Sequence, residues 1–98
     1  MRKVVTREEV RLACAMTLRT FRGKMGLAQE TLALEAGVSR GYMGQLERGE
    51  TTPTIETVCR LAPYLEVSVV AFFEEFERSL ARVRRQAREA RSVSPEQH

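Results

Sequence analysis

The chain has 98 residues, 43% of them hydrophobic, which suits a single domain with one modest core. It contains no Asp, and its one His is the terminal His98, so no nucleophile–base pair or metal-ligand cluster can be assembled. We therefore expect a protein that is not an enzyme and that uses no metal and no cofactor. Cys14 and Cys59 each stand among apolar neighbours, and we expect both to be small buried residues rather than a disulfide pair.

The net charge of +3 is concentrated at one end of the chain. Residues 1–76 carry ten Lys and Arg against ten Glu, whereas residues 77–98 carry six Arg against three Glu. The net charge therefore does not by itself indicate a nucleic-acid partner for residues 1–76, since such a partner would depend on the positions of individual charges. No apolar stretch is long enough to span a bilayer, and the first residues lack the apolar part of a signal peptide. We expect no membrane association and a cytoplasmic location.

Capping residues mark the first two predicted helices. Thr6 and Glu9 have the spacing of a capping box, and Gly26 is a typical helix-ending residue. Between them, apolar residues recur every three or four positions and predict a helix to about residue 24. These residues are Val10, Ala13, Cys14, Thr17, Leu18, Phe21 and Met25. A second, shorter helix is predicted from Gln29 to Ala36, ended by Gly37.

The third predicted helix contains two glycines. Ser39 is a good N-cap, and the helix would extend from Arg40 to about Glu47 before Gly49 ends it. Gly41 and Gly44 each cost a helix about 1 kcal/mol relative to Ala. We expect packing of the inner face to hold this helix, despite its weak propensity. Met43, Leu46 and Glu47 are predicted to hold it from the inner side, with Met43 and Leu46 in the core.

Two further helices complete the prediction. Thr54 caps a fourth, which should kink or end near Ala62 because Pro63 lacks an N–H donor and clashes with the preceding turn; Tyr64 and Leu65 should still be packed. Ser68 caps a fifth helix, and only residues 92–98 look disordered. No segment alternates with period two for long, so the fold class is predicted to be all-α.

Much of the chain resembles a known family. The pieces "LRTFR", "GLAQETLALEAGVS", "YMGQLERG", "PTIETV" and "LEVSVVAFF", between Leu18 and Phe73, closely resemble the lambda-repressor-like (Cro/repressor, Xre-type) helix-turn-helix family. The resemblance implies a five-helix DNA-binding domain, here residues 1–76, with its helix-turn-helix motif at about residues 29–48. Two residues depart from the family pattern: Ala28 replaces the usual Ser or Thr N-cap, and Pro63 interrupts the fourth helix.

The resemblance also implies roles for individual residues. It places Gln29 against a DNA phosphate, Arg40, Gly41 and Gln45 at base-facing positions, and Arg48 and the loop through Thr52 along the DNA backbone. It pairs Arg22 with Glu47 as a structural ion pair. Independently, an exposed helix N-terminus in the major groove would bring Ser39, Arg40 and Tyr42 towards bases and phosphates. For Tyr42, two alternatives stay open: a hydroxyl contact to phosphate, or packing into the domain. We also interpret the two glycines as positions of close DNA approach, with Gly44 facing outward.

The C-terminal extension, residues 77–98, continues the fifth helix with an arginine-rich sequence. An apolar repeat with spacings of four and three suggests a helical interface. It comprises Val69, Phe73, Phe76, Leu80, Val83, Ala87 and Ala90. We expect residues 69–76 to close the core of the small domain and Leu80 and Val83 to lie beyond it. These two residues, with Phe76, are predicted to form a homodimer interface. The arginines are interpreted first as a solvated face and second as an auxiliary phosphate contact.

These observations predict a sequence-specific, dimeric transcriptional regulator that acts mainly by occupying a pseudo-palindromic operator in double-stranded DNA, blocking or contacting RNA polymerase. An alternative is an antitoxin-like protein-interaction module, with a toxin-like partner and secondary DNA binding. A third is a general nucleic-acid binder that uses the arginine-rich tail.

Overall fold

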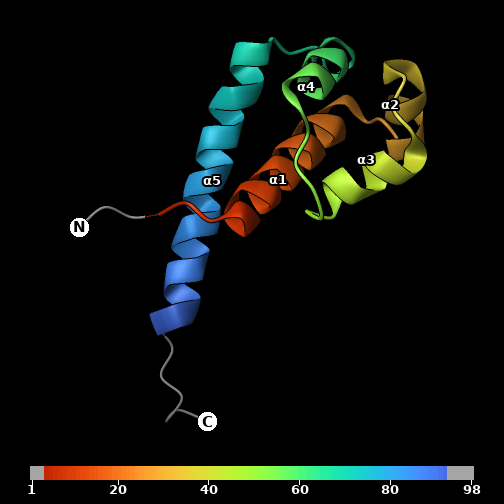
Figure 1. Ribbon diagram of the computed structural model, residues 1–98. Helices are drawn as coiled ribbons and strands as arrows, with labels where there is room; N and C mark the ends of the chain where they lie inside the picture. Colours follow the sequence, from red (N-terminus) through yellow and green to blue (C-terminus); the bar gives the residue numbers. More distant parts are fainter. Residues whose placement is uncertain (1–3, 93–98) are drawn as a thin grey trace.

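The computed structural model describes residues 4–92, with side chains through Ala90. Its helices are α1 (Arg7–Met25), α2 (Gln29–Ala36), α3 (Arg40–Glu47), α4 (Ile55–Leu61), a short 3₁₀ helix η1 (Ala62–Leu65) and α5 (Val69–Ser92) (Figure 1). The described part of the chain contains no strand, which confirms the all-α prediction. Ser92, expected to be disordered, closes α5; the rest of the predicted disordered end, residues 93–98, lies outside the described residues.

Local capping chemistry explains where the first helices begin and end. The Thr6 hydroxyl accepts a hydrogen bond from the Glu9 N–H, and the Glu9 carboxylate accepts one from the Thr6 N–H, each at 3.0 Å. Gly26 and Gly37 end α1 and α2 with φ angles of 65° and 72°, the left-handed conformation that glycine adopts without strain. Ala28 begins α2 without a side-chain cap.

Pro63 has the predicted effect on the fourth helix. The α-helical part ends at Leu61, and residues 62–65 continue as a 3₁₀ turn. Because proline cannot donate the hydrogen bond of a continuing α-helix, the chain tightens there and turns towards α5. Leu65 is buried as expected, whereas Tyr64 is 42% exposed, so the predicted packing of Tyr64 is only partial.

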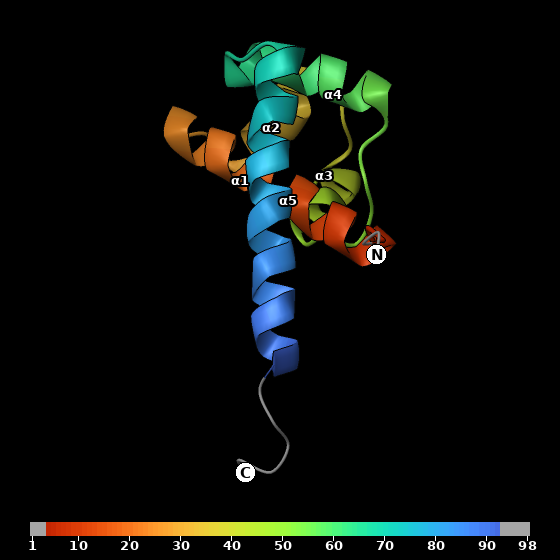
Figure 2. The ribbon, with the colours of Figure 1, turned by 90° about the vertical axis from the view of Figure 1, so that its left-hand side faces the viewer.

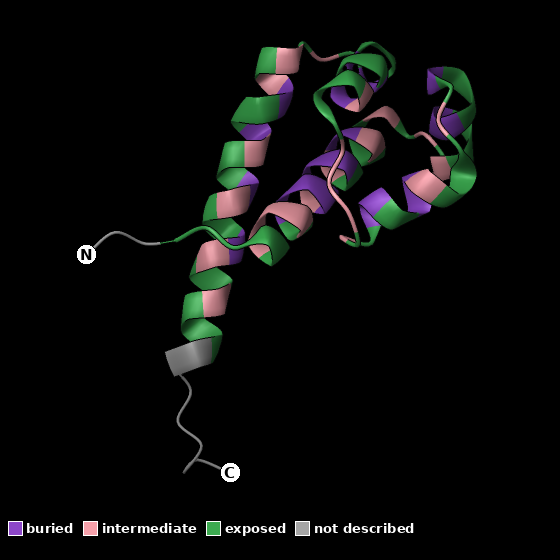
Figure 3. Ribbon diagram, in the orientation of Figure 1, coloured by how far each residue is buried: buried purple, intermediate pink, exposed green. Residues whose placement is uncertain are grey.

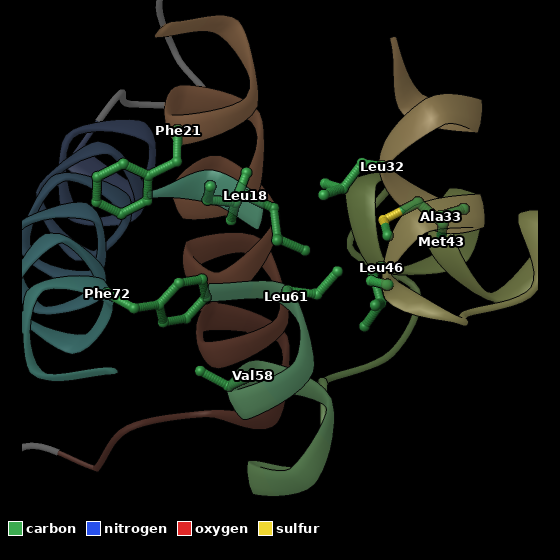
Figure 4. Packing of buried hydrophobic residues seen from close by; sticks show 11 residues of the cluster. Leu18, Phe21, Leu32, Ala33, Met43, Leu46, Val58, Leu61 and Phe72 are labelled. Carbon is green, nitrogen blue, oxygen red and sulfur yellow. The ribbon is translucent and has the colours of Figure 1, made fainter. Parts of the chain in front are cut away.

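The core is assembled around α1, which lies between α5 on one side and the α2–α3 pair on the other (Figures 1 and 2). Figure 4 shows Phe21 and Phe72 at one end of this core and Leu32 and Met43 at the other. The buried cluster also includes Leu18, Ala33, Ala36, Leu46, Val58, Leu61 and Leu65. Cys14 is buried as expected, but Cys59 is exposed, which corrects the expectation that both cysteines are buried.

Helix α5 packs on α1 over more of its length than predicted. Val83 is only 6% exposed, and Ser79 is fully buried, where its hydroxyl lies 3.3 Å from that of Thr17. The buried positions follow the side of α5 that faces α1 (Figure 3). The prediction that Val83 lies beyond the core and requires a partner chain is therefore wrong. The domain boundary predicted after residue 76 lies within α5, before the buried residues Ser79 and Val83.

Candidate nucleic-acid interface

The α2–α3 pair is a compact helix-turn-helix with a connection of three residues. Gly37 turns the chain, and Val38 donates its N–H to the carbonyl of Ala33 at 2.9 Å. Ser39 then caps α3, because its hydroxyl accepts the N–H of Tyr42 at 3.1 Å. Ser39 and Arg40 are exposed, so α3 begins at the surface with its N-terminal end accessible.

The inner face of α3 holds the helix against the body. Met43 and Leu46 are fully buried, in agreement with the sequence prediction. Glu47 is also buried, at 4% exposure, although a carboxylate is costly to remove from water without partners. The hydrogen bonds around Glu47 therefore decide whether α3 can keep this position.

Arg22 and Glu47 form the expected ion pair in a bidentate arrangement. Nε of Arg22 lies 2.7 Å from one carboxylate oxygen, and Nη2 lies 2.8 Å from the other. The third nitrogen of Arg22 donates to the carbonyl of Leu27 at 2.8 Å, which joins α1, the α1–α2 connection and α3. The hydrogen bonding to Glu47 and the charge of that carboxylate raise the pKa of the Arg22 guanidinium above its ordinary value, partly offset by burial. Arg19, which the sequence did not single out, donates to the backbone carbonyl of Glu47.

Gln29, predicted to contact a phosphate, belongs to the same network. Its Nε2 donates to a carboxylate oxygen of Glu47 at 3.2 Å. A side-chain amide has two N–H donors, so this bond leaves the second for another acceptor. The position at the first turn of α2 also adds the positive end of a helix dipole to that donor.

The outer side of α2 and α3 forms a polar groove of about 300 Å³. We call it the α2–α3 groove; it is lined by Gln29, Glu30, Arg40, Gly41, Gly44 and Arg48. Nη2 of Arg40 lies 3.0 Å from a carboxylate oxygen of Glu30, and these side chains are 74% and 67% exposed. Nε of Arg48 lies 2.6 Å from a carboxylate oxygen of Glu50. Neither Glu30 nor Glu50 was identified from the sequence, although each lies close in sequence to a predicted DNA-binding residue.

Other predicted residues take different positions. Tyr42 packs partly against the hydrophobic core, which favours the second of its two alternatives. Gly44 does not face open solvent as expected; it is buried, and the guanidinium of Arg48 lies over it. Gln45 is exposed and Thr52 is half-buried, and neither lines the α2–α3 groove.

A second depression lies on α5, away from the groove. It has a volume of about 500 Å³. We call it the α5 depression; it is lined by Val69, Val70, Phe73, Glu74, Phe76, Glu77 and Leu80. Two of the three predicted dimerisation residues, Phe76 and Leu80, lie here, and Val83 does not.

Within residues 4–92, no His, Cys and Glu side chains cluster in a way that would hold a metal ion. None of the helices in that range is long and apolar enough to cross a membrane.

Comparison with known proteins identifies relatives of this architecture. A family model described as helix-turn-helix matches residues 18–72. The HTH-type transcriptional regulator SlrR of Bacillus subtilis is 33% identical over 58 residues, which are 58% of this chain and 38% of SlrR, so this chain spans well under half of that protein. The crystal structure of the clp gene regulator ClgR from Corynebacterium glutamicum is similar with a TM-score of 0.76 at 33% identity, over 84% of this chain and 87% of that one. The restriction-modification controller protein C.Esp1396I, crystallised as a tetramer with its natural 35 base-pair operator, has a TM-score of 0.67 at 28% identity, over 74% of this chain and 95% of that one.

Proposed function

We propose that this chain, which belongs to the helix-turn-helix family HTH_3, is a transcriptional regulator that binds operator DNA through α3. The observation that carries this proposal is the accessible N-terminal end of α3, with Arg40 beside the α2–α3 groove. The likeness to C.Esp1396I, a protein crystallised on its operator, supports it. The cytoplasmic location expected from the sequence is part of the same proposal.

Base recognition is assigned to Arg40 and Gln45, which are both exposed on α3. With this helix in the major groove, Arg40 has the geometry to bond O6 and N7 of guanine through two N–H groups. Gln45 lies five residues further along and has the matching donor and acceptor for N6 and N7 of adenine. Each such pair discriminates against a wrong base by about 1–3 kcal/mol.

Phosphate contacts are assigned to Gln29 and Arg48, which both line the groove. In the free protein the groove arginines are paired with carboxylates, Arg40 with Glu30 and Arg48 with Glu50. Exposed ion pairs of this kind contribute only about 0–1 kcal/mol. Arg40 can therefore exchange its carboxylate for a DNA contact at small cost. Because Glu30 and Glu50 offset the charges of Arg40 and Arg48, the groove carries little net charge, which limits non-specific attraction.

Selection of bound duplexes from a random library tests this function. We expect a pseudo-palindromic site, with Arg40→Ala and Gln45→Ala each weakening specific binding by about 1–3 kcal/mol. Arg60→Ala is the matched control, since Arg60 is also an exposed arginine paired with a carboxylate but lies on α4. If the α3 variants bind the selected duplex as tightly as the control, α3 is not the recognition helix.

We further propose a homodimer formed through the α5 depression. Val70 is 69% exposed and Phe73 36% exposed, and such an apolar patch favours burial against a partner. The partner most consistent with the charges is a second copy with α5 antiparallel. Acidic residues Glu74 and Glu77 flank the first half of the helix, and the second half carries arginines at 82, 84, 85 and 88. A two-fold axis near Leu80 would place each acidic half opposite a basic half.

Sedimentation of Leu80→Asp tests the dimer. A charge buried at the interface should prevent dimerisation, so that the protein sediments with half the mass of the dimer. Operator binding should weaken as well, because the two half-sites are then bound independently. Ala81→Asp is the control, since Ala81 is exposed and does not line the depression. An unchanged mass for Leu80→Asp, or a wild-type protein that is monomeric, contradicts this interface.

A further inference from the structure

The position of the Arg48 guanidinium depends on a missing side chain at Gly44. A Cβ atom built on Gly44 would lie 2.8 Å from Nη1 of Arg48 and 3.6 Å from Cζ. The first distance is shorter than real Cβ contacts, so any side chain at this position displaces the guanidinium. At Gly41, three residues earlier on the same helix, a Cβ would meet no atom within 4 Å. The two glycines of α3 therefore differ in what they make possible.

Glu50 holds the guanidinium of Arg48 from another direction. Nε donates to one carboxylate oxygen at 2.6 Å, and Nη2 donates to the other at 3.3 Å. These hydrogen bonds lower the pKa of the Glu50 carboxyl and raise that of Arg48. Nη1, the atom nearest Gly44, takes part in neither bond. The planar group is thus held by Glu50 while it lies across the outer side of α3.

We propose that Gly44 is a positioning residue for Arg48: without a Cβ, it lets the guanidinium lie across α3 in the α2–α3 groove, where it meets a DNA phosphate. The part of this inference that concerns DNA rests on the proposed function. Arg48 is the C-cap residue of α3, and a Cβ at position 44 would displace its guanidinium from the outer side of that helix. Gly44 therefore decides whether the groove presents one guanidinium, from Arg40, or two.

Gly44 thus has a different role from the one predicted from the sequence, in which both glycines are positions of close DNA approach. The guanidinium of Arg48 covers Gly44, so the role of Gly44 lies in that contact. Gly41 is exposed and free of neighbours, so close approach of DNA applies to Gly41 alone. The two substitutions to alanine should consequently differ in mechanism.

NMR of the arginine side chains tests the positioning without DNA. The Nε–H signal of Arg48, assigned by its loss in Arg48→Lys, should be protected from exchange in the wild type because Glu50 accepts that proton. In Gly44→Ala this signal should shift and exchange faster, whereas Gly41→Ala should leave it unchanged. An identical Arg48 signal in Gly44→Ala and the wild type overturns the proposal.

A double-mutant cycle tests the consequence for binding. The probe is a duplex selected by the wild-type protein. Gly44→Ala should weaken binding by about tenfold, the equivalent of one hydrogen bond to a charged group, but by less than about twofold when Arg48 is already Ala. An equal loss in both backgrounds shows that Gly44 acts on DNA directly, and no loss shows that the position of Arg48 is irrelevant; either result overturns the inference. If no duplex is selected at all, the proposed function fails, while the NMR result still decides the positioning.

Discussion

Replacing Arg22 by Met should destabilise the domain strongly, because it leaves the Glu47 carboxylate buried. The side chain of Glu47 is 3% exposed, and two of its three side-chain hydrogen bonds come from Arg22. After the substitution only Gln29 still donates to the carboxylate. Removing one partner of a buried ion pair costs about 3–5 kcal/mol.

The expected loss lies at the lower end of that range. The side chain of Arg22 is 24% exposed, so water can reach the vacated position from that side. We therefore expect a loss of about 3 kcal/mol in the free energy of unfolding. For a domain of this size, each kcal/mol lowers Tm by about 4–8 °C, which corresponds to a fall of roughly 12–24 °C.

Thermal and urea unfolding followed by circular dichroism measure this loss. The double variant Arg22→Met/Glu47→Met should be more stable than Arg22→Met alone, because the stranded charge is gone. Arg60→Met is the control, since its exposed pair with Glu56 contributes only about 0.3–0.5 kcal/mol. The reasoning is refuted if Arg22→Met costs less than about 1 kcal/mol, or if the double variant is no more stable than the single one.

Three further predictions concern stability and reactivity. Gly41→Ala should raise the free energy of unfolding by about 0.5–1 kcal/mol, since its Cβ meets no neighbour; a destabilised variant in urea unfolding would contradict this. Ala28→Ser should add about 1 kcal/mol to the free energy of unfolding by capping α2, because Ala28 already has the extended backbone of an N-cap, with φ −71° and ψ 149°. An unchanged urea midpoint would show that no cap forms. Burial raises the pKa of the Cys14 thiol to about 11, so iodoacetamide at pH 8 should modify only the exposed Cys59, as mass spectrometry of the native protein will show; rapid modification of both would contradict the packing of α1.

The first three helices were predictable because their ends depend on local chemistry. The Thr6–Glu9 capping box, the Ser39 cap and the glycines after α1 and α2 act through neighbouring backbone groups, so their spacing in the sequence is sufficient. The Pro63 break is local in the same sense. The inner face of α3 followed from the helix-turn-helix resemblance, which made this segment a helix with Met43 and Leu46 inside.

The packing of α5 was not predictable in the same way. The apolar repeat suggested one face through Phe73, Leu80 and Val83, whereas the buried face passes through Phe72, Ser79 and Val83. Ser79 is polar and gives no hydrophobic signal; it is buried because Thr17 on α1 lies opposite. Contacts between distant segments decide this register.

The candidate site was predictable in composition but not in arrangement. The family resemblance named Arg40 and Arg48, yet it did not indicate that Glu30 and Glu50 hold them in the free protein. These pairs depend on side-chain conformations. The same is true of Gly44, whose role becomes visible only from the position of the Arg48 side chain.

The specificity ratio tests the central claim most directly. It compares the affinity of the wild-type protein for its selected duplex with that for a shuffled duplex of equal length and composition, at one physiological salt concentration. Recognition of bases by α3 predicts a ratio of about 10³ or more. Equal affinity for both duplexes, lost together as salt is raised, would show that only phosphate attraction operates and would contradict the account.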